Sequence, residues 1–152
     1  MFRRLQDSPR ILEIFYQAAY RLILPFCRWL TPGSWTERVF VQLEKLTKKP
    51  IFDCRMCGQC VLHHTGMTCP MTCPKNLRNG PCGGVLPNGH CEIFPDKACI
   101  WVQAWHRSQL MPAFGSEIIH IQPPLNNSLR DTSAWINDLH QKEKMIPKGW
   151  EI

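Results

Sequence analysis

The stretch that decides the fold begins with CRMCGQC at residues 54–60, continues with HHTGMTCPMTCPKNLRNGPCGG at 63–84 and ends with HCEIFPDKAC at 90–99. It holds eight of the nine cysteines of a 152-residue chain and is dense in Pro and Gly. A segment of this composition cannot bury enough apolar surface to fold on its own. Disulfides, zinc or iron–sulfur clusters must therefore hold it. Because the N-terminus shows no secretory signal pattern, we expect a cytoplasmic protein and regard disulfides as the least favoured of the three.

The spacing of the cysteines favours iron–sulfur clusters. Three cysteines in a C-x2-C-x2-C run are typical of 4Fe–4S binding, whereas zinc usually takes one pair from each of two places. A Cys-Pro further along completes that pattern, and both Cys69-Pro70 and Cys73-Pro74 qualify. Eight thiolates suffice for two four-thiolate sites, although the spacing leaves the connectivity open. We predict one or two 4Fe–4S clusters, with zinc as the alternative, on Cys54, Cys57, Cys60, Cys69, Cys73, Cys82, Cys91 and Cys99.

Other residues near the cysteines have secondary roles in this interpretation. Lys75 and Arg78 are candidates to stabilise the negative charge of a cluster, and Trp101 with Trp105 to shield it from water. Three histidines of this region are candidates to replace a cysteine as metal ligand: His63, His64 and His90. We expect them instead to lie in solvent-exposed turns or to contact the ligands rather than the metal. Cys27 lies in an apolar helical pattern and is expected to be a buried small hydrophobic residue.

The rest of the chain predicts a small, irregular, α-rich, metal-stapled fold with about four helices. A helix begins at Ser8-Pro9 and is kinked or ended by Pro25. A second has the capping-box pair Ser34 and Glu37, an apolar face and a stop at Pro50. Further predicted elements are a short hairpin of 85–86 with 91–94, a helix over 97–110 capped by Asp96, an extended piece at 118–121 and a helix over 128–141. We divide the chain into a helical N-terminal arm (1–50), a cysteine-rich metal-binding domain (51–142) and a tail (143–152).

The apolar face of the arm must be buried against another surface. We expect it to pack on the second helix, with docking on a partner subunit or contact of residues 9–30 with a membrane surface as alternatives. The lysines at the end of the second helix, Lys45, Lys48 and Lys49, are expected to be solvated.

Charge and missing motifs exclude several classes of protein. The formal net charge of +6 falls to about +2 if two four-thiolate sites each carry −2, so nucleic acid is not an expected partner. The most apolar stretch, 11–30, is interrupted by three charged residues, so no transmembrane segment is expected. No Walker loop, dinucleotide-binding fingerprint or nucleophile elbow is present. Electron transfer, or support of a partner enzyme, is therefore the favoured function.

Three blocks give the chain a resemblance to a known family. They are CRMCGQCVLHHTGMTCPMTCPKNLRNGPCGG (54–84), CEIFPDKACIWVQAW (91–105) and PPLNNSLRDTSAWIN (123–137). Together they resemble the methylenetetrahydrofolate reductase C-terminal domain family over roughly residues 50–140. Members of that family are fused to, or encoded beside, a flavin-dependent reductase with a barrel fold.

The resemblance implies a non-catalytic small subunit of the reductase complex that converts 5,10-methylene- to 5-methyltetrahydrofolate. In acetogen-type relatives such subunits are associated with iron–sulfur clusters and pass electrons toward the flavin subunit, and the eight cysteines from Cys54 to Cys99 match the family's positions. The family is also described as zinc-containing. This chain differs in its long apolar arm and has no barrel, so the folate and flavin residues do not carry over to it.

Overall fold

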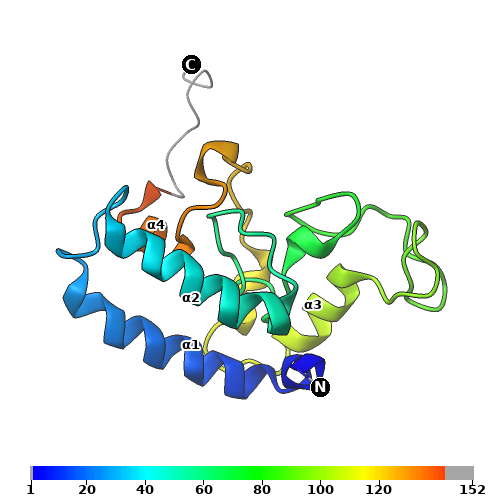
Figure 1. Cartoon of the computed structure of the whole chain (residues 1–152). Coiled ribbons are helices and arrows are strands. Elements are labelled where there is room, and N and C mark those ends of the chain that lie inside the picture. Colours follow the sequence, from blue (N-terminus) through cyan, green and yellow to red (C-terminus); the bar gives the residue numbers. More distant parts are fainter. Residues whose placement is uncertain (1, 143–152) are drawn as a thin grey trace.

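Helices α1 (Pro9–Ile23) and α2 (Trp35–Phe52) run side by side, and the irregular cysteine-rich loops begin where α2 ends (Figure 1). The computed structural model describes residues 2–142, so the predicted tail lies outside the described residues. Within that range the other helices are α3 (Ile100–Ser108) and α4 (Ala134–Leu139). Five short 3-10 segments complete the order: η1 (Phe2–Asp7), η2 (Leu24–Phe26), η3 (Pro70–Thr72), η4 (Gly115–Ile119) and η5 (Asn127–Leu129). The described part of the chain is thus small and helix-rich, as predicted, and it contains no strand longer than an isolated bridge.

Helix α1 is anchored to the cysteine-rich loops through one apolar and one charged side chain. Leu12 belongs to a buried cluster with Leu62, Met67 and Met111. Glu13 is 2% exposed, and its Oε1 accepts hydrogen bonds from the backbone N–H groups of residues 113 (2.9 Å) and 114 (2.8 Å). The helix ends at Ile23, and Pro25 lies in the 3-10 turn that follows, as predicted. An apolar groove of about 630 Å³ separates α1 from α2, so α1 packs mainly on the core loops rather than on the second helix.

Helix α2 begins as the sequence predicts but ends later. Ser34 Oγ accepts a hydrogen bond from the N–H of Glu37 at 3.4 Å, while the carboxylate of Glu37 accepts from Gly33 N–H at 2.6 Å instead of completing the box on Ser34. The predicted stop at Pro50 is wrong, because Pro50 lies inside the helix. A proline removes one backbone donor, but this helix continues until Asp53 adopts a left-handed conformation with φ of 50°.

The side of α2 that faces the protein is largely charged. Its buried residues are Glu37, Val41, Glu44 and Lys48, so the expectation of a solvated Lys48 is wrong. The predicted apolar face of this helix is exposed instead at Val39 (44%), Leu43 (51%) and Leu46 (74%). Ser133, just before α4, donates hydrogen bonds from its N–H to the Glu37 carboxylate and from its hydroxyl to the Glu44 carboxylate. Because these donors lie inside the protein, the charged side of α2 faces inward. A broad apolar surface on α1 and α2 is therefore left uncovered by residues 2–142.

The remaining elements are shorter than predicted. The hairpin is reduced to an isolated bridge between Val85 and Cys91, and a second bridge pairs His90 with Ala98. Because this bridge holds residue 98 in extended pairing, α3 begins only at Ile100 with Cys99 as its N-cap, not after Asp96. The piece at 118–121 is not extended throughout, since η4 includes residues 118 and 119, and the helix expected over 128–141 is split into η5 and α4. None of the helices in residues 2–142 has the length and apolarity required to cross a membrane.

Candidate metal centre

The eight clustered cysteines line two separate cavities, four in each. The first cavity is lined by Cys54, Cys57, Cys60 and Cys69. The second is lined by Cys73, Cys82, Cys91 and Cys99. All nine cysteines lie within the described residues and none forms a disulfide. The tertiary structure thus divides a run of cysteines that the sequence leaves unassigned, and it separates the two Cys-Pro pairs between the two cavities.

Backbone conformation places the thiols of the first cavity. Met56 (φ 49°) and Gly58 (φ 74°) turn the 54–60 loop so that its three cysteines face the same cavity. The N–H of Met56 donates to Cys54 Sγ at 3.4 Å. A Cβ on Gly58 would lie 2.0 Å from the backbone oxygen of Leu129, so only glycine fits where the loop meets the segment before α4.

The first cavity is narrow, about 20 Å³, and its four cysteines are half-buried. Burial raises the pKa of the Cys60 thiol to about 11. Burial and then the charges of neighbouring cysteines raise the pKa of Cys69 to about 12. Four thiols in such a place ionise together only if a positive centre lies between them. The donor set of this cavity therefore fits a metal ion or a cluster.

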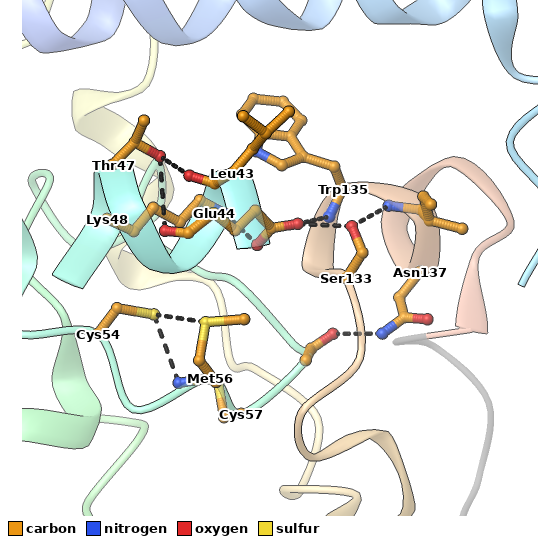
Figure 2. A network of polar contacts seen from close by, with 12 residues as sticks. Leu43, Glu44, Thr47, Lys48, Cys54, Met56, Cys57, Ser133, Trp135 and Asn137 are labelled. Carbon is orange, nitrogen blue, oxygen red and sulfur yellow. Dashed lines mark hydrogen bonds and ion pairs between the residues drawn. The ribbon is translucent and has the colours of Figure 1, made fainter. Parts of the chain in front are cut away.

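A buried lysine of α2, Lys48, lines the first cavity; Figure 2 shows it beside Glu44 and Trp135. Lys48 is 8% exposed, and its Nζ lies 2.8 Å from Glu44 Oε2 and 5.1 Å from the ring centroid of Trp135. Burial alone would lower the pKa of Lys48, but the charges of Cys60 and Glu44 outweigh it and raise the pKa to about 12. Lys48 therefore brings a fixed positive charge to the thiols. Sequence reasoning missed it, although Val41, Glu44 and Lys48 share a helical face.

The segment around α4 connects this lysine to the cysteine loop. Glu44 Oε1 accepts hydrogen bonds from Ser133 Oγ at 2.5 Å and from the N–H of Trp135 at 3.3 Å (Figure 2). Asn137 Nδ2 in turn donates to the carbonyl oxygen of Gly58 at 2.9 Å. Helix α2, the segment 133–137 and the 54–60 loop thus form one hydrogen-bonded unit beside the first cavity.

The second cavity is larger, at about 390 Å³, and its Cys82 is exposed. The N–H of Gly84 donates to Cys82 Sγ at 3.4 Å. Lys75 lies at this cavity in an exposed ion pair with Glu92. Arg78 lies at the first cavity instead, buried with its guanidinium donating to Gln59 O at 3.4 Å. The two basic residues expected near a cluster are therefore distributed one to each cavity.

The other residues singled out in the sequence, three histidines, two tryptophans and Cys27, contribute little to the two cavities. His63 and His64 do not line either cysteine cavity, and His90 contacts the carbonyl oxygen of Pro95 through Nδ1 at 2.5 Å. Trp101 is buried and lines the second cavity, whereas Trp105 is 51% exposed and does not. Cys27 is only partly buried, which corrects the expectation of a buried residue.

Comparison with known proteins identifies the family. The model of the family described as "Methylene-tetrahydrofolate reductase C terminal" matches residues 34–128, which include α2, α3 and all eight cysteines of the two cavities. No curated protein and no solved structure matches the chain. The family match covers more than half of the chain and confirms the resemblance carried by the cysteine blocks. This chain therefore belongs to the methylenetetrahydrofolate reductase C-terminal family.

Proposed function

We propose that this chain is an iron–sulfur accessory subunit of a methylenetetrahydrofolate reductase complex. In this proposal each cysteine cavity holds one 4Fe–4S cluster, the narrow first cavity widening around it on binding, and the subunit passes electrons to a flavin-containing barrel subunit or stabilises it. The family match supports the link to the reductase and to one-carbon metabolism. The observation that carries the proposal is the division of eight cysteines into two cavities of four, since four thiolates are the ligand count of a 4Fe–4S cluster.

The spacing of the thiols favours a cluster over a single zinc ion. A tetrahedral zinc with Zn–S bonds of 2.3 Å holds its sulfurs about 3.8 Å apart. Within the described residues, the only group of three candidate ligand atoms all within 4.8 Å of one another consists of two histidines and a glutamate. No three cysteine sulfurs of the described residues meet this limit, which favours the wider spacing of a cubane with one thiolate at each of four corners.

Groups around the thiols are suited to a negatively charged centre. When bound, a 4Fe–4S cluster supplies reversible one-electron transfer. Lys48 and Arg78 beside the first cavity, and Lys75 beside the second, offset the negative charge of four thiolates. The N–H groups of Met56 and Gly84 donate to cysteine sulfurs, which favours the more reduced and more negative state. These residues fix the charge and the polarity of the two sites.

The apolar surface of α1 and α2 is the proposed contact with the reductase subunit. Among its exposed residues are Phe15 (68%), Leu22 (71%) and Leu46 (74%) on the two helices, and Trp29 (80%) in the turn between them. Apolar patches of this kind are rare on isolated soluble proteins and mark interaction sites. The family match makes a reductase subunit the favoured occupant over a membrane surface.

Anaerobic isolation of the chain with its co-purifying partner tests this function. We expect a brown protein with about eight iron and eight acid-labile sulfide per chain, and a flavoprotein in the same complex. Reduction of the clusters should be followed by reduction of the flavin in rapid-mixing absorbance measurements. A colourless protein that retains zinc in air and lacks sulfide would reject the redox role and leave a zinc-stapled interaction module.

A further inference from the structure

A second cluster of potential metal ligands lies outside both cysteine cavities. His63 and His64 come from the turn after the first cysteine loop, and Glu117 comes from η4. One ligand atom of each residue lies within 4.8 Å of the other two. The oxygen Glu117 Oε2 lies 3.0 Å from His64 Nδ1 and 3.8 Å from His63 Nε2. Side chains more than 50 residues apart in sequence are thus brought to one point.

The polar atoms of this cluster lack partners. His63 Nδ1, His64 Nδ1 and Glu117 Oε2 are buried and have no hydrogen-bond partner within the described residues. His64 Nδ1 and Glu117 Oε2 are 3.0 Å apart, which is close enough for a hydrogen bond, but the two groups are not aligned to form one. Buried polar atoms are costly unless they bind something. Two of these atoms, His64 Nδ1 and Glu117 Oε2, face each other, and His63 Nε2 lies 3.8 Å from the same oxygen, which favours a bound cation over a completed hydrogen-bond network.

The surroundings hold the imidazoles in position and in the neutral form. The ring of Tyr16 stacks on His63 with centroids 5.1 Å apart, and Phe114 contacts it edge-on at 5.5 Å. Burial, and then the charge of His64, lowers the pKa of His63 to about 4. Burial also lowers the pKa of His64 and raises that of Glu117. Neutral imidazoles have the free lone pairs that metal coordination needs.

We propose that His63, His64 and Glu117 bind a divalent transition-metal ion of the zinc class. Two imidazoles and one carboxylate form a donor set used by zinc and by other first-row metals, whereas Mg²⁺ and Ca²⁺ prefer oxygen ligands. Three protein ligands leave a coordination position open. A pocket of about 350 Å³ begins at His64 and is lined by Trp101, Trp105 and Asn79, so water or a small ligand reaches the ion from that side.

Cobalt(II) is the probe that separates this site from the cysteines. The full chain is isolated anaerobically with its cysteine-bound metal in place, dialysed against a weak chelator and titrated with Co²⁺. We expect one equivalent to bind with d–d absorption bands of nitrogen and oxygen coordination and without thiolate charge-transfer bands. The cysteine-bound metal is measured before and after the titration, so that a failure of the iron–sulfur proposal does not affect this result.

Variants assign the ligands. Glu117→Gln keeps the shape of the side chain but removes its charge, and His64→Ala removes one imidazole; each is expected to weaken Co²⁺ binding at least tenfold without changing the cysteine-bound metal. His106→Ala is the matched control, because His106 is exposed and outside the cluster, and it should bind Co²⁺ like the parent. Equal binding by all three variants, no binding by the parent chain, or thiolate bands in the bound state would each overturn the proposal.

Discussion

Lys48 and Glu44 form a buried ion pair on α2, with Nζ and Oε2 2.8 Å apart and side chains only 10% and 4% exposed. The pair faces inward, between the hydrogen-bonded segment 133–137 and the first cysteine cavity. A buried charge is tolerated only while its partners remain in place. This relationship links the stability of α2 to the environment of the thiols.

Removal of one member of the pair should destabilise the protein strongly. Glu44→Gln leaves the Lys48 charge buried without its partner, so we expect a loss of about 3–5 kcal/mol in the free energy of unfolding. Urea unfolding of the metal-loaded chain measures it. Lys45→Met is the control, since its ion pair with Asp131 is exposed and 3.8 Å long, and it should cost about 1 kcal/mol or less. Similar losses in the two variants would contradict the role given to the buried pair.

The double variant refines this prediction. Glu44→Gln combined with Lys48→Met removes both charges and should be less destabilised than Glu44→Gln alone, because no buried charge is left without a partner. The free energies of unfolding of the parent, both single variants and the double variant form the required cycle. Additive losses would show that the two side chains do not interact.

The glycine at residue 58 should not tolerate a side chain. Gly58→Ala places a Cβ 2.0 Å from Leu129 O at a φ of 74°, so both a clash and backbone strain arise. We expect a loss of metal from the first cavity and a destabilisation of more than about 3 kcal/mol. Gly89→Ala has a similar φ of 79° but open space around it, and should cost about 1–2 kcal/mol. Metal analysis and urea unfolding of both variants compare the two; equal effects would rule out the clash.

The two cavities should lose metal independently. Cys57→Ser removes a proposed ligand of the first cavity and Cys91→Ser a proposed ligand of the second, so each variant is expected to lose about half of the bound iron and sulfide. Cys27→Ser serves as the control, because Cys27 lies in neither cavity, and its metal content should be unchanged. Equal metal content in all three variants, or complete loss in both ligand variants with the fold intact, would argue against two separate four-thiolate sites.

The apolar surface of α1 and α2 should matter for association but not for stability. Phe15→Ser and Leu46→Ser change side chains that are 68% and 74% exposed, so the free energy of unfolding should change by less than about 1 kcal/mol. Binding to the co-purifying flavoprotein should weaken at least tenfold, as titration of the two purified components would measure.

Ile121→Ser is the matched control for this surface, because Ile121 is 87% exposed and lies outside both helices. It should leave the association unchanged. Unaltered binding of the flavoprotein by the α1 and α2 variants, together with their loss of binding to anionic vesicles, would instead assign the surface to a membrane.

Local features of the fold were predictable from the sequence because they depend on neighbouring residues. The Ser34 cap, the end of α1 before Pro25 and the loop character of the cysteine-rich segment follow from short-range hydrogen bonding and backbone preference. The orientation of α2 was not predictable, because its carboxylates are satisfied by Ser133, which is 89 residues from Glu44. Apolar periodicity predicted an amphipathic helix, but it did not indicate whether the apolar or the charged side of α2 would be buried.

The sequence by itself determined the number and spacing of the cysteines and the family to which the chain belongs, because spacing and motif are properties of the linear chain. Only the tertiary structure decided which four cysteines share a cavity, that Lys48 is buried beside one of them, and that Glu117 meets His63 and His64. These relationships join residues that are distant in sequence. They depend on how loops and helices pack, and a local sequence pattern does not contain that information.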